Sequence, residues 1–363
     1  GLELIRAPRP SEDASVPEIF EKKLPRRTLL VGAGAMGAGL LSHRVFAAAA
    51  RPQNLIDFHH HTVPRNFSLP GKPGNNQTAT GAQRNTIEAH LADMDAAGVS
   101  KSILSSGSNA LFKNPATLLK DVRLVNDDMA EAVSGHPKRF GMFATLPLPD
   151  VDASLKEIAY GLDTLKADGV HLFTSYDSTK FLGDPAFDPV FEELNRRHAV
   201  VKTHPVANAC CNFQGFDSDL ASVIELSNDN VRAIAKVLLS GTASRYPNIR
   251  WIWSHSGGTM PYLYARFERH AESLRDKAMD VVPNGVMHEM KRFYYETAQG
   301  NTEMQFSALL RMIPVSQVLF GSDYPYRPAM ESVEGIDAYG FKAADKRAID
   351  YGNALRLMPQ LKV

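Results

Sequence analysis

Residues 54–61 of the chain read NLIDFHHH, an apolar run that ends in three consecutive histidines. Its length and composition are typical of a buried strand. Side chains alternate between the two faces of a strand, so His59 and His61 share one face and His60 lies on the other. A strand that delivers two imidazoles from one face to its own end predicts a functional site at that end.

The same kind of apolar run recurs along the rest of the chain. Together with the first run, the predicted strands span residues 54–58, 101–106, 139–146, 169–174, 199–204, 249–255, 292–297 and 315–323. Apolar residues at steps of three and four predict helices between them, most clearly over residues 86–98, 115–135, 151–169, 187–197 and 258–278. Eight strands that alternate with helices predict an α/β fold, a distorted (β/α)8 TIM barrel. This barrel forms a single catalytic domain over residues 51–363.

Ionisable residues stand at the ends of four of these strands, and barrel enzymes keep their active sites at the carboxyl ends of the strands. Besides the first run, one strand ends in His204 before a proline, and another ends in His255 before Ser-Gly-Gly. The last strand ends in Asp323, within GSDYP. Imidazole nitrogens and a carboxylate suit Zn²⁺ or a related divalent ion such as Mn²⁺. The sequence therefore predicts a metal site at this rim.

These motifs carry a family resemblance. HxH after the first strand, HP after the fifth, SHSGG after the sixth and GSDYP after the eighth resemble the amidohydrolase superfamily. The most similar branch is that of amino-carboxymuconate-semialdehyde decarboxylase and methylsalicylate decarboxylase. The resemblance runs from about residue 54 to 358 and includes stretches outside the motifs, such as KRFGMFATLPLPD and FLGDPAFDPVFEELNRR.

The resemblance implies roles for individual residues. The metal ligands would be His59, His61, His204 and Asp323, with His255 as the acid/base beside the metal-bound water. Asp323 and His255 are thus the expected catalytic pair. The strand over 169–174 offers no lysine for the carbamate that bridges two metals in binuclear relatives, so we expect one divalent ion per subunit. Zinc is the expected ion, with manganese as the alternative.

The family branch implies a non-oxidative decarboxylase of a small aromatic, hydroxybenzoate-like or dienoic carboxylic acid. Hydrolysis of a C–C, amide or lactone bond is the alternative, because a divalent ion also activates water for attack on a carbonyl carbon. Arg266 falls where a related decarboxylase lends an arginine to its neighbour's site, which predicts a homodimer. Guanidinium groups pair with carboxylates in a bidentate fashion. The expected substrate contacts are Arg65, Arg266 and Arg327 for the carboxylate, and Phe67, Phe173, Tyr324 and Tyr326 as pocket walls.

Several polar residues near the site have no assigned role. Lys202 lies two residues before His204 on the same strand face, and a charge inside a barrel requires a partner, for which Glu296 is the candidate. His171 lies on the strand over 169–174. Cys210 and Cys211 follow His204 in a loop and are expected to be plain thiols, because the ligands already named complete a zinc site.

The first fifty residues have a different composition. Arg26-Arg27, an apolar run over 29–41 and four alanines at 47–50 predict a twin-arginine export signal in residues 1–50, and hence a periplasmic or exported protein. The alternative is the GxGxxG pattern at 32–37, GAGAMG, with Asp57 twenty residues further on to hold a ribose. That pattern would indicate a nicotinamide-dependent dehydrogenase. Without a signal, the protein would be cytoplasmic.

The overall charge excludes one class of partner. The 363 residues include 40 Lys and Arg and 40 Asp and Glu, so the chain lacks the basic excess of a nucleic-acid binder. No apolar run approaches the roughly 20 residues of a membrane-spanning helix. We therefore expect neither nucleic acid nor a membrane as a partner, whereas the family resemblance implies a small-molecule carboxylate.

Overall fold

The structure, a computed structural model, describes residues 54–62, 86–107, 114–176, 179–206, 218–277 and 279–361. Eight parallel strands form one sheet, in which each strand pairs with the next one along the chain. They are β1 (Leu55–Thr62), β2 (Val99–Ser106), β3 (Phe140–Thr145), β4 (Gly169–Phe173), β7 (Val200–His204), β8 (Arg250–Trp253), β9 (Tyr294–Glu296) and β10 (Val318–Leu319). Each of the eight predicted strands is confirmed.

The last strand returns to the first and nearly closes the sheet. The backbone N–H of Phe58 donates to the carbonyl oxygen of Phe320 at 3.0 Å, and that of Asp323 donates to His59 at 2.8 Å. His60 and Tyr324 form a parallel bridge. Because β10 is sealed to β1 in this way, all eight carboxyl strand ends meet at one rim, as the predicted barrel requires.

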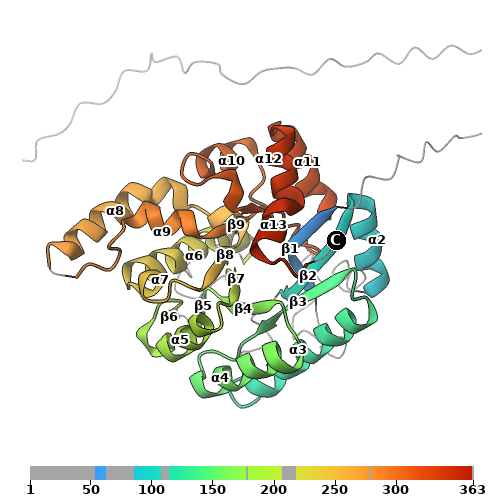
Figure 1. Ribbon diagram of the computed structural model, residues 1–363, viewed down its shortest axis with the longest axis horizontal. Coiled ribbons are helices and arrows are strands. Elements are labelled where there is room, and N and C mark those ends of the chain that lie inside the picture. The colour runs from blue at the N-terminus through green and yellow to red at the C-terminus, as the bar shows by residue number, and fades with distance from the viewer. Residues whose placement is uncertain are drawn as a thin grey trace, which may run out of the picture. The chain divides into compact units, whose positions relative to one another are not determined.

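Helices surround the strands, which lie in the middle of the molecule (Figure 1). The five predicted helical stretches are confirmed as α2 (Ile87–Ala97), α3 (Leu118–Gly135), α4 (Val151–Ala159), α5 (Asp188–Arg196) and α8 (Met260–Arg275). The stretch predicted over 151–169 leaves the α-helix early and continues as a π-helical turn, Tyr160–Thr164. None of the helices described here has the length and apolar character needed to span a membrane.

Further elements complete the structure. A short antiparallel hairpin, β5 (Ser175–Tyr176) with β6 (Lys180–Phe181), follows β4. Helix α6 (Ser218–Leu239) precedes β8 and packs against α8. The other α-helices within the described residues are α7 (Thr242–Arg245), α9 (Val286–Arg292), α10 (Glu303–Leu309), α11 (Ala329–Tyr339), α12 (Ala343–Arg347) and α13 (Asn353–Leu357).

An irregularity in β1 determines which side chains reach the barrel interior. Ile56 and Phe58 pack in a buried apolar cluster together with Val200 and Ile252, at the end that α13 closes. The pairing of β1 with β2 then shifts register between Asp57 and His60. Such a bulge changes the phase of the alternation. Both Phe58 and the next residue, His59, therefore face inwards. The barrel interior is apolar around Ile56 and Phe58 and becomes polar from His59 onwards, at the carboxyl end of the strands.

Candidate metal centre

Four side chains from three strand ends converge at the rim of the barrel. The ligand atoms of His59, His61, His204 and Asp323 all lie within 4.8 Å of one another. The Nε2 atoms of His59 and His61 are 2.8 Å apart, and each lies 3.2–3.3 Å from Oδ1 of Asp323. All four residues are buried. The structure thus brings together the four residues that the sequence analysis grouped, in a divalent metal site.

The electrostatics of His61, His204 and Asp323 suit a cation. Although burial opposes the shift, the charges of Glu296 and Asp323 raise the pKa of His59, so this ring would give up a proton when a metal binds. Burial, together with the neighbouring His59, lowers the pKa of His61 to about 3. Burial likewise lowers the pKa of His204 well below its ordinary value. Burial alone would raise the pKa of Asp323, but the charge of His59 and hydrogen bonds from His59 and His61 outweigh it and hold this pKa well below its usual range. Neutral imidazoles and an ionised carboxylate are the forms that bind a metal.

Glu296 fixes the orientation of the His59 ring through its Nδ1 atom. Oε1 of Glu296 lies 2.6 Å from Nδ1 of His59, and Oε2 accepts a hydrogen bond from the backbone N–H of Ala298 at 2.7 Å. Gly321 permits this close approach, because a Cβ there would lie 2.1 Å from Oε2 of Glu296. A carboxylate on the second nitrogen of a ligating imidazole fixes its tautomer and raises its basicity. Glu296 at the end of β9 therefore presents Nε2 of His59 to the metal site.

Asp57 ties β1 to β10 beneath the site. It accepts hydrogen bonds from the backbone N–H groups of His59 and Ser322, at 2.9 and 3.0 Å, from the Ser322 hydroxyl at 2.6 Å and from Nδ1 of His60 at 3.0 Å. Its side chain is fully buried. A carboxylate with four protein donors inside a barrel cannot hold a ribose, so the structure contradicts that role of Asp57 in the dinucleotide-binding alternative.

His255 stands beside the four residues in a tight turn, His255–Gly257, directly after β8. Its ring centre lies 4.8 Å from that of His59. Its backbone N–H donates to Oε1 of Glu296 at 2.8 Å, and its Nδ1 lies 2.8 Å from the carbonyl oxygen of Ala298. A carbonyl can only accept, so Nδ1 carries the proton and the neutral ring keeps Nε2 as an acceptor.

The chain matches the family model described as amidohydrolase over residues 56–359. This range covers every residue of the metal centre. The chain belongs to the amidohydrolase family.

Individual relatives within this family are decarboxylases. The chain is 32% identical to the 6-methylsalicylic acid decarboxylase acuB of Aspergillus aculeatus over 332 residues, which are 85% of this chain and 96% of that protein. It is 30% identical to the decarboxylase macB of Penicillium terrestre over 331 residues, again 85% and 96%. A dihydroxybenzoic acid decarboxylase from a Polaromonas species, solved with manganese, has the same fold, with a TM-score of 0.70 at 19% identity over 86% of this chain and 98% of that one.

Two of the aromatic residues expected as pocket walls lie next to the metal centre of this amidohydrolase. The ring of Phe173 is 6.3 Å from that of His204, and the ring of Tyr326 is 5.6 Å from that of His61. Tyr324 does not join them. It stacks on His60 at 5.0 Å, on the face of β1 away from the metal ligands, because its side chain alternates with that of Asp323. Tyr324 thus contacts His60 rather than a ligand histidine, and Phe67 lies outside the described residues.

The structure brings none of the described arginines into the metal centre. Arg266 is exposed on α8. Arg327 is exposed at the rim and lies 3.8 Å from Glu331. Arg65 falls outside the described residues. Within one subunit, the described part of the chain thus leaves the carboxylate-binding group unassigned.

Lys202 lies inside the barrel without the predicted ion pair. Its Nζ has no hydrogen-bond partner among the described residues, and Glu296 instead accepts from His59 and His255. Burial lowers the pKa of Lys202 to about 8, although the charge of Glu296 opposes the shift. His171, its neighbour on β4, is fully buried and both its ring nitrogens lack partners among the described residues. Cys210 and Cys211 lie outside the described residues.

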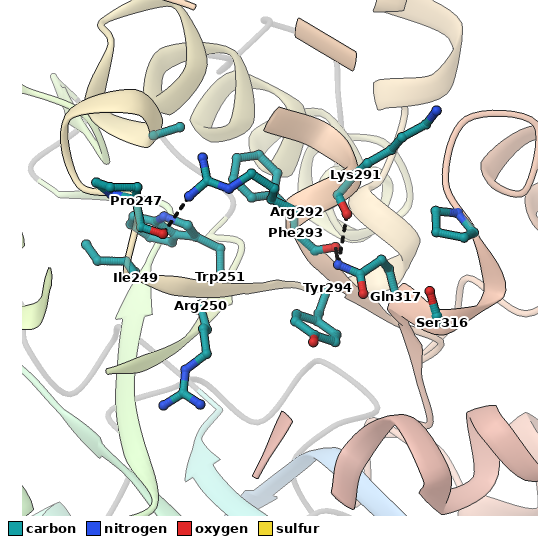
Figure 2. Close-up of a pocket in the computed structure, with 12 residues that line it drawn as sticks. Pro247, Ile249, Arg250, Trp251, Lys291, Arg292, Phe293, Tyr294, Ser316 and Gln317 are labelled. Carbon is teal, nitrogen blue, oxygen red and sulfur yellow. Dashed lines mark hydrogen bonds between the residues drawn. The ribbon is translucent and has the colours of Figure 1, made fainter. Parts of the chain in front are cut away.

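A hollow of about 410 Å³ lies at the opposite, amino end of the strands (Figure 2). Its guanidinium groups are used in structural hydrogen bonds. Arg292 donates to the carbonyl oxygen of Pro247 at 2.5 Å, and Arg250 donates to that of Leu357 at 2.9 Å. The Lys291 ammonium points away from the hollow in Figure 2. These two arginines therefore have structural partners, and the hollow lies apart from the metal centre.

Sequence reasoning missed the residues that orient the metal ligands. Glu296 was considered only as a partner of Lys202, and Asp57 only in the dinucleotide alternative. Gln299, whose side-chain amide donates to Oδ2 of Asp323, carried no signal. Asp57 and Glu296 are single carboxylates within apolar strand ends, LIDF and YYET. Such a carboxylate requires a buried partner, and that requirement could have identified both residues.

We expect Glu296→Gln to weaken metal binding by about 10- to 100-fold, the usual cost of losing the carboxylate behind a ligating histidine. Titration of the metal-free protein in competition with a chromophoric chelator measures this affinity. Glu303→Gln, an exposed change on α10, serves as the control. An affinity equal to that of the wild type in Glu296→Gln would contradict the orienting role.

Proposed function

We propose that this chain is a metal-dependent, non-oxidative decarboxylase of a small aromatic carboxylic acid of the hydroxybenzoate type, or of a dienoic acid. The observation that carries the proposal is a cluster of four convergent metal donors with an additional buried imidazole, His255, against His59. A relative that is 32% identical over most of both chains is a 6-methylsalicylic acid decarboxylase. The enzyme would thus be a carbon–carbon lyase, specifically a carboxy-lyase.

The proposed ligands of one divalent cation per subunit are His59, His61, His204 and Asp323. Three imidazoles and a carboxylate are typical of zinc, which we propose as the resident ion. Manganese is the alternative, since the Polaromonas relative was solved with it. A bound cation supplies positive charge that orients the substrate and polarises its oxygen atoms. Elemental analysis of the purified protein, and activity after reconstitution with each ion, distinguish the two metals.

His255 is the proposed proton carrier. In decarboxylation the bond between the ring carbon and the carboxylate breaks, CO₂ leaves, and the electron pair stays on the ring carbon, which takes up a proton. Nε2 of His255 is the atom that would first take up a proton, from the substrate hydroxyl group or from water, and then pass it to the ring carbon, because Nδ1 is held by Ala298. Asp323 is the second proposed catalytic group. Its Oδ1 faces His59 and His61 while Gln299 holds its Oδ2.

Aromatic and basic residues at the rim would hold the substrate. We propose that Phe173 and Tyr326 flank its ring, since each lies within ring contact of a ligand histidine. Arg65 and Arg327 are proposed to bind its carboxylate, because a guanidinium pairs with two carboxylate oxygens at once. Arg327 would have to leave Glu331 to do so.

A homodimer would give Arg266 a role that one subunit does not. On exposed α8, this arginine is available to a second copy of the chain, and we propose that it reaches the partner's substrate carboxylate. We expect Arg266→Ala to raise KM for carboxylate substrates about 10- to 100-fold, the loss of a charged hydrogen bond. Arg269→Ala, an exposed arginine on the same helix, is the control, and light scattering gives the oligomeric state. Unchanged kinetics would remove Arg266 from the site.

The reaction is tested by incubating the metal-loaded protein with a panel of hydroxybenzoates and measuring CO₂ release. We expect release from at least one hydroxybenzoate with a hydroxyl group next to the carboxylate, since the two oxygens can then share the cation. The alternative is a hydrolase of a C–C, amide or lactone bond. No CO₂ from any acid, together with hydrolysis of an ester, amide or lactone, would favour that alternative.

For residues 1–50, we propose a twin-arginine export signal and a periplasmic or exported location. The arginine pair, the apolar run and the alanine string support this proposal, and the family match begins after them, at residue 56. We expect a variant that lacks residues 1–50 to retain full activity, because none of the proposed site residues lies there. Loss of activity on deletion, with nicotinamide cofactor binding by the full chain, would instead support the dehydrogenase alternative.

A further inference from the structure

Helix α6 buries two polar residues where an amphipathic helix normally presents apolar ones. Asp229 and Asn230 have no exposed surface, and they lie in the middle of the helix within the sequence Ser-Asn-Asp-Asn, residues 227–230. Burying an amide or a carboxylate costs free energy unless hydrogen bonds compensate. The partners of these two side chains show what that burial achieves.

Asp229 joins the ends of β4 and β7. Its Oδ2 accepts hydrogen bonds from the Thr174 hydroxyl and from the backbone N–H of Val206, the latter at 3.0 Å. The backbone N–H of Thr174 in turn donates to the carbonyl oxygen of His204 at 2.9 Å. One carboxylate therefore holds two points next to His204: Val206, two residues after the end of β7, and Thr174, the residue after β4 that pairs with the His204 carbonyl.

Asn230 holds the neighbouring strand end. Its Nδ2 donates to the carbonyl oxygen of Ser254 at 3.1 Å, directly before His255. The backbone there is strained, because His255 and Ser256 have φ angles of +51° and +55°. Such conformations persist only where surrounding contacts enforce them. Asn230 supplies one of these contacts to the turn that carries the His255 ring.

The two preceding residues of α6 also contact the chain that follows β8. The carbonyl oxygen of Ser227 lies so close to Gly258 that a Cβ there would approach to 2.1 Å. The side chain of Asn228 accepts a hydrogen bond from the Thr259 hydroxyl at 3.1 Å. Helix α6 thus contacts the chain around the turn after β8 with Ser227, Asn228 and Asn230, and the chain after β7 with Asp229.

We propose that Asp229 and Asn230 are positioning residues with separate targets, Asp229 for the metal-binding orientation of His204 and Asn230 for the catalytic orientation of His255. Neither side chain contacts the site itself. The inference rests on the proposed function for the role of His255, whereas the role of Asp229 concerns metal binding and stands on its own. Two adjacent residues of one helix would then control two different properties of the site.

The test is a pair of single variants in the full chain, Asp229→Ala and Asn230→Leu, with the exposed Lys236→Ala on the same helix as control. We expect Asp229→Ala to raise the Kd for Zn²⁺ of the metal-free protein about 10- to 100-fold, the range found for groups that orient metal ligands. We expect Asn230→Leu to leave this Kd within about threefold and to lower kcat about 10-fold or more, as misplacement of a reacting group does.

Two further measurements separate positioning from general destabilisation. Asp229→Asn keeps an acceptor oxygen, and we expect its Zn²⁺ affinity to be close to that of the wild type. This comparison can be made even if Asp229→Ala does not fold. In histidine ¹H–¹⁵N spectra of the protein, we expect Asn230→Leu to shift or broaden the His255 Nδ1–H resonance, without any substrate present. Equal losses of metal affinity and kcat in both variants, or no loss in either, would overturn the proposal. An unaltered His255 resonance in Asn230→Leu would overturn its second half.

Discussion

His204→Ala should lose metal binding and activity together. A site of four ligands binds a divalent ion such as zinc with about 10–16 kcal/mol, so one ligand accounts for about 3 kcal/mol, or at least 100-fold in Kd. His204 completes the set from the far side, because its ring lies 4.7 Å from that of His61 and 5.2 Å from that of His59. We therefore expect metal-free protein after purification, and CO₂ release below about 1% of the wild-type rate at low metal concentration.

Thermal unfolding gives an independent readout of the same loss. A ligand that binds only the folded state raises the midpoint of unfolding, so a chelator should lower the midpoint of the wild type. The chelator should leave the midpoint of His204→Ala unchanged, because this variant carries no ion to remove. His288→Ala, an exposed histidine on α9, should behave like the wild type. Full metal content in purified His204→Ala would show that the four donors do not act as one site.

The residues of this site could be predicted from sequence because each stands where a strand ends. An apolar run marks a strand, the (β/α)8 pattern brings the carboxyl ends to one rim, and a polar residue after the run must then face that rim. His204 and Asp323 are more than a hundred residues apart, yet these rules alone place them together. The bulge in β1 was not needed for the prediction, but it explains how the histidines reach the interior after Ile56 and Phe58 have filled it.

The residues that orient the ligands could not be predicted in the same way. Asp229 and Asn230 lie in a helix, and it is the packing of α6 next to the strand ends that brings them to Val206 and Ser254. The direction of the Tyr324 ring depends on local geometry in a related way. The residue after Asp323 is close to the site in sequence, but alternation sends its ring to the outer face of β1, against His60. Sequence position identifies the strand end, whereas the direction of a side chain depends on local geometry.

His255→Asn should show the opposite pattern, with metal retained and catalysis lost. His255 is not among the four residues that converge on one point, and its Nδ1 is held by the Ala298 carbonyl rather than left for a cation. Asparagine keeps a donor of similar reach for this carbonyl but has no group that titrates near neutral pH. Loss of a general acid–base typically lowers the rate about 10²- to 10⁴-fold. We expect a fall in kcat of that order, with KM and the Kd for the metal within about threefold of the wild type.

Comparison with His204→Ala makes this result decisive. A protein that binds its ion as tightly as the wild type, but no longer releases CO₂, assigns His255 to proton transfer. A fall in bound metal together with the loss of activity would make His255 a ligand instead. The structure offers a second group of donors for that case, since His59, His255 and Glu296 also have ligand atoms within 4.8 Å of one another. Metal content per subunit therefore separates the two roles. If a second cation binds at this group, the wild type holds two ions per subunit and His255→Asn holds one.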